Sequence, residues 1–144
     1  MDFSSIWQRD LASVGKVVAS YVLMFPVGWY RERSEHSVGI RTFPIVAMAS
    51  CGYVLMASSM DTAAQSRVVQ GMVAGIGFIG GGAILKSENH VHGVATAASI
   101  WNTGVVGASV ALEHYFLAIS LALLNLLALQ FLRPVKDRLD HNGQ

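Results

Sequence analysis

The sequence predicts an all-α integral membrane protein, a single-domain bundle of five transmembrane helices that covers residues 1–144. Composition supports this class, because 53% of the residues are hydrophobic and only 13% are charged, against about 25% charged residues in an ordinary soluble domain. The mean hydropathy of +0.47 agrees with it. Uncharged stretches of about 20 residues, the length that a helix needs to cross a bilayer, also recur along the chain.

The first predicted span covers residues 11–30 and contains one charged residue, Lys16. Its position near the end of the span lets its long side chain reach the headgroups. The residues before the span place apolar side chains at near-helical spacing: Phe3, Ile6, Trp7 and Leu11. This spacing predicts a short amphipathic piece on the membrane surface.

Four further spans are predicted from uncharged stretches: residues 43–60, 68–85, 94–112 and 115–132. Polar loops separate them, and Pro134 is expected to end the fifth helix. The chain contains a single cysteine, Cys51. This excludes an internal disulfide and a cluster of thiolate metal ligands.

The distribution of lysine and arginine predicts the orientation. One set of loops contains seven of these residues: Arg31, Arg33, Arg41, Lys86, Arg133, Lys136 and Arg138. The opposite set contains three: Arg9, Lys16 and Arg67. The positive-inside rule therefore places the N-terminus outside and the C-terminus in the cytoplasm. The expected location is the bacterial inner membrane, which the chain crosses several times.

The third predicted span, Val68–Leu85, reads VVQGMVAGIGFIGGGAIL and contains six glycines and no charge. Two pairs of glycines lie four residues apart, so the members of each pair share a helix face: Gly71 with Gly75, and Gly77 with Gly81. Faces of this kind let a neighbouring membrane helix approach closely. We therefore expect a buried helix around which the other spans pack.

Residues 75–80 also match the dinucleotide-binding pattern G-x-G-x-x-G. That pattern carries meaning only after a strand and at the start of a helix. Here it lies in the middle of an apolar segment, so helix packing is the favoured interpretation.

The fourth span places small and hydroxyl-bearing residues at steps of three and four: Thr96, Ser99, Thr103 and Gly107. We expect this face to pack against the third span, with interhelical hydrogen bonds worth about 0.6 to 2 kcal/mol each. Packing is favoured over a path for a solute.

Ionisable residues within or beside membrane spans are functional candidates, and four are singled out: Glu32, Arg41, Asp61 and Arg67. Asp61 and Arg67 flank the entry to the third span. They either pair with each other or cap and solvate a loop. For Glu32, a charge cluster that fixes the topology is favoured over ion binding or catalysis.

No catalytic residue, metal site or cofactor is expected, and the protein is not predicted to be an enzyme. Glu88, His90 and His92 form a run whose side chains suit a transition metal, but no second cluster completes a site. Ser109 and His114 suggest a serine hydrolase only superficially, because no further residue supplies an oxyanion hole.

Three sequence blocks resemble the MgtC/SapB family of bacterial inner-membrane proteins. The first contains Gly28, Arg31-Glu32-Arg33 and Gly39-Ile40-Arg41-Thr42, similar to the family patterns G-L-E-R-E-R and G-x-R-T. The second is Arg67 followed by Gly75-Ile76-Gly77-Phe78-Ile79-Gly80-Gly81-Gly82, similar to R-x7-G-I-G-F-L-G-A-G. The third is Val91-His92-Gly93 with Thr96-Ala97-Ala98-Ser99-Ile100-Trp101, similar to V-x-G-L-T-T-A-A-x-x-W.

The resemblance implies five spans with the C-terminus inside, in a short member without the soluble C-terminal domain of the longer, virulence-associated proteins. Roles of those members, such as survival at low magnesium or inhibition of the ATP synthase through membrane contacts, are tied to the longer form. The chain departs from the family pattern at Tyr30, Ala64 and Gly71, where the family has a glutamate, an acid and a glutamine.

We therefore expect a small membrane protein that acts through helix–helix contact with a membrane partner or with itself. The alternative is an ion transporter or channel subunit, which would need polar groups near the midplane of the membrane. The absence of charge from spans two to five favours contact between helices. Expected partners are membrane lipid and a membrane protein or a second copy, and no nucleic acid.

Overall fold

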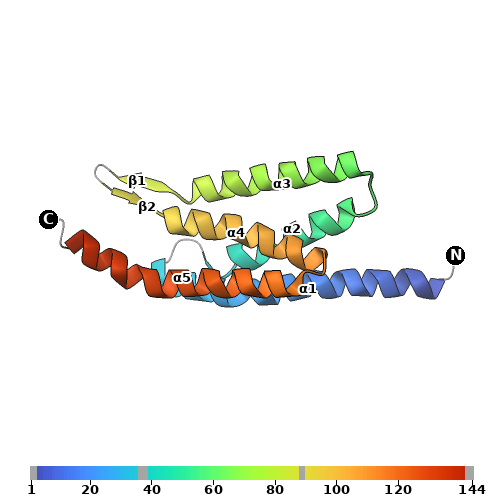
Figure 1. Cartoon of the computed structure of the whole chain (residues 1–144), viewed down its shortest axis with the longest axis horizontal. Coiled ribbons are helices and arrows are strands. Elements are labelled where there is room, and N and C mark those ends of the chain that lie inside the picture. The colour runs from blue at the N-terminus through green and yellow to red at the C-terminus, as the bar shows by residue number, and fades with distance from the viewer. Residues whose placement is uncertain (1–2, 36–38, 88–89, 142–144) are drawn as a thin grey trace.

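The structure is a computed structural model that describes residues 3–35, 39–87 and 90–141, with side chains described at 7–33, 39–84 and 91–132. These residues form five helices and one two-stranded hairpin (Figure 1). In chain order the elements are α1 (Phe3–Glu35), α2 (Thr42–Ala57), α3 (Thr62–Gly82), β1 (Leu85–Ser87), β2 (His90–His92), α4 (Val94–Ala111) and α5 (Tyr115–His141).

The prediction of an all-α protein with five helices is confirmed for the described part of the chain. Three helical segments are long and apolar enough to cross a membrane: Trp7–Arg33, Val94–Ala111 and Tyr115–Leu132. α2 is apolar but has only 16 residues, about 24 Å of helix at 1.5 Å per residue. α3 is long enough, but its first two turns contain Gln65, Ser66 and Arg67, which lower its mean hydropathy.

Several helix ends differ from the predicted spans. α3 begins at Thr62 because the Asp61 carboxylate accepts a hydrogen bond from the Ala64 N–H at 2.9 Å, which caps the helix. It ends at Gly82, so Leu85 belongs to a strand and not to a last helical turn. The hairpin pairs β1 with β2 antiparallel, with Leu85 opposite His92.

The two outer helices extend beyond their predicted ends. α1 is one continuous helix from Phe3, so the predicted surface piece is its first turns. The prediction that Pro134 ends the last helix is wrong, because α5 continues to His141. A proline removes only its own N–H from the hydrogen-bond ladder, so a helix can continue past it with a local distortion.

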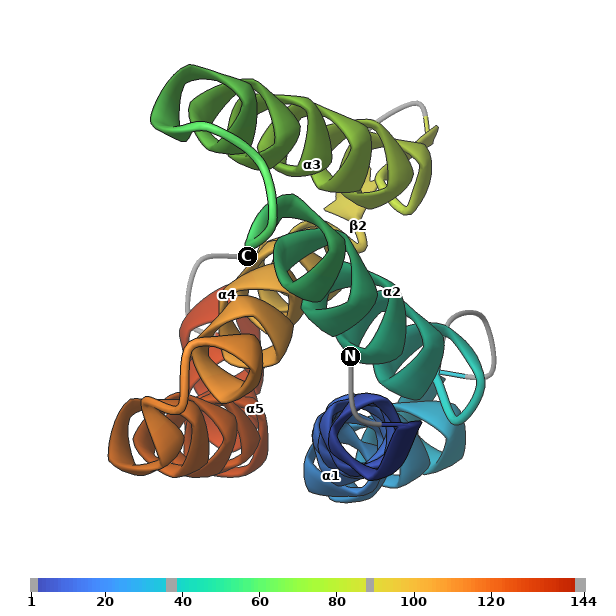
Figure 2. The same cartoon turned by 90° about the vertical axis from the view of Figure 1, so that its right-hand side faces the viewer.

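The helices form three layers, with α3 on one side, α2 and α4 in the middle, and α1 and α5 on the other side (Figure 2). α4 packs against all four other helices, whereas α3 packs mainly on α4 and α2. The prediction that the others pack around the glycine-rich helix is therefore wrong, because α4 takes that place. The close packing of α4 on α2 requires glycine at position 107, because a β-carbon there would overlap the Ala47 carbonyl of α2.

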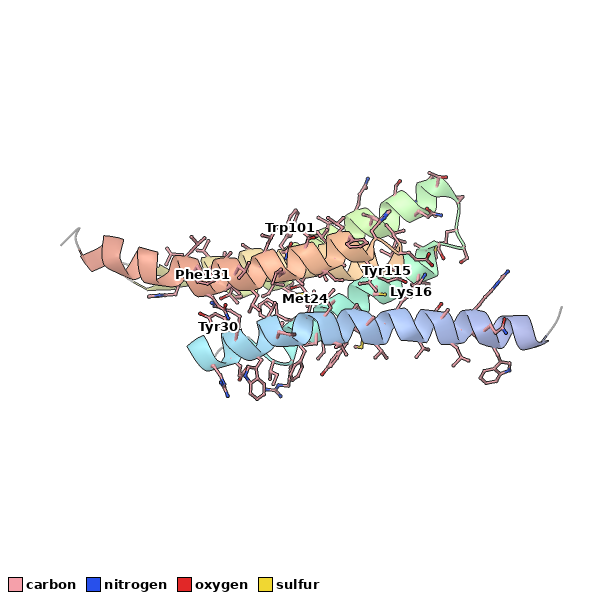
Figure 3. All side chains as sticks on the ribbon, turned by 60° about the horizontal axis from the view of Figure 1, so that its bottom comes forward. Lys16, Met24, Tyr30, Trp101, Tyr115 and Phe131 are labelled. Atoms are coloured by element: carbon pink, nitrogen blue, oxygen red, sulfur yellow. The ribbon has the colours of Figure 1, made fainter. Side chains whose placement is uncertain are left out.

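Lys16 links two parts of the bundle toward the end away from the hairpin (Figure 3). Its ammonium group donates to the Glu113 carboxylate at 2.8 Å and to the Ala111 carbonyl at 3.3 Å. Figure 3 shows Lys16 on the side of α1 that faces the start of α5. This side chain therefore links α1 to the turn between α4 and α5. The headgroup position expected for it stays a prediction.

Candidate functional site

The α1–α2 connection is fixed by close backbone contact between two parts of the first sequence block. The Ile40 N–H donates to the Glu32 carboxylate at 3.1 Å. A β-carbon on Gly39 would lie 2.6 Å from the backbone nitrogen of Glu32, and one on Gly28 would lie 3.0 Å from the Gly39 carbonyl oxygen. Glu32 therefore holds Gly39 and Ile40 close to α1, and only glycine permits this approach at position 39.

Arg31, beside Glu32 on α1, is only 4% exposed. Its Nη2 donates a hydrogen bond to Oγ1 of Thr96, which is 2% exposed in the first turn of α4. The two residues are 65 positions apart in the sequence. The contact therefore joins the first sequence block to the third.

The guanidinium lies against the positive end of a helix. α4 begins after Gly93, which supplies no side-chain cap. The N–H groups of Val94, Ala95 and Thr96 have no acceptor within the helix, and they give this end a partial positive charge. Arg31 and the start of α4 together make a buried region of positive potential.

Polar groups of α5 extend this region. Ser99 of α4 donates from Oγ to Oδ1 of Asn125 at 2.8 Å. Nδ2 of Asn125 is buried and has no acceptor among the residues that the structure describes. Tyr30 donates to the Leu129 carbonyl at 3.3 Å, and Figure 3 shows it between α1 and α5. The Asn125 amide therefore keeps an N–H donor for which the described residues supply no acceptor.

These groups border a cavity of about 480 Å³ between α1, β2, α4 and α5, which we call the Arg31 cavity. Its polar lining consists of Arg31, His92, Thr96, Ser99 and Asn125. The remaining walls are mostly apolar and include Val94, Ala98, Ala128, Leu129 and Leu132. The cavity therefore combines hydrogen-bond donors with walls that suit a hydrocarbon chain.

The predicted small face of α4 is buried, but it does not face α3 as expected. Thr96 contacts α1 and Ser99 contacts α5. The Thr103 hydroxyl donates to the Ser99 carbonyl of its own helix at 2.8 Å, and Gly107 lies against α2. The reason is that α3 packs on a different face of α4, where Gly80 of α3 approaches the Ala97 carbonyl.

Four glycines predicted to form the packing seam do not meet another helix within the described chain. A β-carbon at Gly71, Gly75, Gly77 or Gly81 would find no atom within 4 Å. α3 is rotated so that Ile76 and Gly80 are its buried residues. These four glycines lie on two open strips of α3, Gly71 with Gly75 and Gly77 with Gly81, which together we call the open glycine face.

The open glycine face adjoins a second cavity. This cavity, about 520 Å³, lies between α2 and α3. Gly71 and Gly75 line it, together with apolar residues that include Val46, Met72 and Ile79. Gly71 and Gly75 therefore border a groove and not a closed contact.

The four charged candidates are not brought together. Glu32 and Arg41 lie at the hairpin end of the bundle, where Arg41 is exposed and makes no side-chain cap to α2. Asp61 caps α3 at the other end, and it forms no ion pair with Arg67 among the described side chains. Of the two roles left open for Asp61, the structure shows the cap.

Sequence reasoning missed the two residues that define the Arg31 cavity. The sequence analysis counts Arg31 with the charges of a polar loop, because it stands next to Glu32 and Arg33 in a charged run. Asn125 interrupts the apolar run from Leu121 to Leu129. A lone asparagine in such a run is a signal for an interhelical hydrogen bond, and it could have located this site.

No group of three or more potential metal ligands occurs among the described residues. Of the E-x-H-x-H run, Glu88 and the side chain of His90 lie outside the described residues. His92 is exposed on β2.

Comparisons with known proteins place these observations in a family. The model of the MgtC family matches residues 17–138. The chain is 30% identical over 126 residues to the protein MgtC of Salmonella typhimurium, covering 86% of this chain and 54% of that protein. It is 38% identical over 97 residues to the protein SrpB of Synechococcus elongatus, covering 57% and 53%. The chain spans about half the length of these curated relatives. No solved structure matches.

Proposed function

We propose that this chain, which belongs to the MgtC family of membrane proteins, acts by binding a transmembrane helix of a partner protein, or of a second copy, through the open glycine face of α3. The observation that carries this proposal is the empty space above Gly71, Gly75, Gly77 and Gly81. Small residues four apart allow two membrane helices to approach closely. The open glycine face has this spacing, but no described helix of the chain packs against it.

The energetic argument concerns glycine itself. Within a helix a glycine is about 1 kcal/mol less favourable than alanine, and these four have no neighbour that alanine would displace. Gly80, Gly104 and Gly107 differ, since a β-carbon at each would press on another helix. Close approach to another helix explains why Gly80, Gly104 and Gly107 are glycines. A helix from outside this chain, packed on the four open glycines, would explain those positions in the same way.

The alternative, an ion transporter or channel subunit, draws support from the buried polar groups of the Arg31 cavity. These groups lie at the hairpin end of the bundle, around the first turns of α4. A transport path requires polar groups across the thickness of the membrane. We therefore favour helix contact, and we expect the purified chain in liposomes to give no ion flux above that of empty vesicles.

We also propose that the N-terminus lies outside and the C-terminus in the cytoplasm of a bacterial cell, with the chain in the inner membrane. The C-terminal ends of α1 and α5 lie at the same end of the bundle as the hairpin (Figure 1), so Arg31, Arg33 and Arg41 belong to one side. The positive-inside rule assigns that side to the cytoplasm. Reporters fused after Gln144 and in the α2–α3 turn should lie on opposite sides, and the same side for both would contradict this orientation.

The decisive experiment separates association from folding. Gly75→Leu should reduce energy transfer between labelled copies, or co-purification of the partner, by at least about tenfold, which corresponds to roughly 1.4 kcal/mol. Its thermal melt as a single chain should stay unchanged, because the new side chain enters open space. Gly15→Leu is the matched control, since Gly15 is an equally open glycine on α1. Association that survives in Gly75→Leu would refute the proposal.

A further inference from the structure

The Arg31 cavity combines a buried cation, a helix N-terminus and apolar walls, and helix contact through α3 does not require these features. We propose that it binds the phosphate group of an anionic amphiphile, namely the headgroup of an anionic phospholipid. The cavity lies between α1, β2, α4 and α5. This inference therefore stands or falls separately from the function proposed for α3.

The first step concerns charge. Arg31 is 4% exposed and borders the cavity beside the N-terminus of α4. A cation at that end of a helix is unfavourable, because the helix dipole makes the end positive. Anions are stabilised at helix N-termini for the same reason. An anion in the cavity would therefore be attracted both by the Arg31 guanidinium and by the start of α4.

The second step concerns hydrogen bonds. A phosphate group offers several strong acceptor oxygens, and a planar guanidinium matches them well. Asn125 supplies a further donor, because its buried Nδ2 has no acceptor among the described residues. Its Oδ1 already accepts from Ser99, which fixes the orientation of the amide. Donors of α1, α4 and α5 therefore line one cavity, where an oxygen-rich ligand could accept from them.

The third step favours a lipid over free phosphate. Ala98 of α4 and Ala128 and Leu132 of α5 line the cavity and are exposed on the bundle surface. In a membrane those positions face hydrocarbon, so an acyl chain can lie along them while its phosphate reaches Arg31. Basic pockets between transmembrane helices on the cytoplasmic side bind anionic headgroups in this way.

The test uses the full chain in a zwitterionic detergent, with thermal melting and native mass spectrometry as readouts. Phosphatidylglycerol should raise the melting temperature and remain bound, and phosphatidylcholine with the same acyl chains should bind at least about tenfold more weakly. Arg31→Gln should remove this preference. Arg33→Gln is the matched control, because Arg33 is exposed two residues further along and stacks on Trp29.

A second variant keeps the test valid if Arg31→Gln does not fold. Ala128→Trp starts from an exposed position and fills the apolar wall while leaving the cation in place. It should abolish the binding of phosphatidylglycerol but keep any stabilisation by inorganic phosphate. Stabilisation by inorganic phosphate alone, with no added effect of the lipid, would keep the anion site and assign it to the free ion. Equal binding of both lipids, or unchanged phosphatidylglycerol binding in both variants, would overturn the proposal.

Discussion

The buried guanidinium of Arg31 in α1 donates a hydrogen bond to the hydroxyl of Thr96, in the first turn of α4. Through this contact, sequence blocks 65 residues apart meet at one end of the bundle. The surrounding glycines have structural roles, since Gly28 and Gly39 fix the connection after α1, and Gly93 fixes the entry to α4. Motif residues of this chain therefore divide into those that shape the fold and those left open on α3.

The Arg31–Thr96 contact should contribute measurably to stability. Thr96→Val should lower the free energy of unfolding by about 1.5 to 3 kcal/mol, the range for hydrogen bonds to charged groups. Denaturant titration in mild detergent measures this value. Thr62→Val, at an exposed threonine of α3, is the control. A double-mutant cycle with Arg31→Gln should show coupling, and additive effects would contradict the contact.

Gly93 should tolerate no side chain. Its φ of 85° is left-handed, and a β-carbon would also overlap the Ala83 carbonyl. Gly93→Ala should therefore destabilise the protein by at least about 1 to 3 kcal/mol, the cost of a strained backbone position. Gly77→Ala, in the open face of α3, should be neutral or stabilising by up to about 1 kcal/mol. Thermal melts of the two variants in the same detergent compare them directly, and equal melts would contradict this account.

The Lys16–Glu113 ion pair predicts that the stability of the protein decreases at acidic pH. The hydrogen bond from Lys16 lowers the pKa of the Glu113 carboxyl below its ordinary value of 4.5. A carboxyl whose pKa is lower in the folded state stabilises that state above its unfolded pKa, and the contribution is lost as the pH falls through the folded pKa. The melting temperature should therefore fall below pH 4.5 by more in the wild type than in Glu113→Gln. The effect is small, because the Glu113 side chain is 67% exposed.

Asp10→Asn, at another exposed acid, is the control and should keep the wild-type pH profile of the melting temperature. Identical profiles for the wild type and Glu113→Gln would exclude this role of the ion pair.

The existence of the five helices could be predicted from uncharged stretches, because a membrane helix satisfies its own backbone polar groups. Their arrangement could not. Glycines four apart show that a face permits close approach, but they do not identify the helix that approaches. On α3 the face that carries Gly80 packs on α4, whereas the face that carries Gly75 stays open. Both faces look alike in the sequence.

The site was harder to predict than the fold. The burial of Arg31 depends on where α4 begins, and that start depends on the left-handed Gly93 after a short hairpin. Thr96 and Ser99 were identified from their spacing, but their partners Arg31 and Asn125 lie on two other helices. Partners across helices depend on tertiary packing, which a single sequence does not specify.

The measurement that tests the central claim most directly is photo-crosslinking from the groove beside the open glycine face. A photoreactive side chain at Ile79 lines this groove without filling the glycine positions. Ile119 of α5 is the matched control, because these two isoleucines are 45% and 53% exposed. We predict that illumination of native membranes gives a discrete protein adduct from position 79, either with a second copy or with one membrane protein, and none from position 119. Lipid adducts alone from position 79, at the level seen from position 119, would contradict the account.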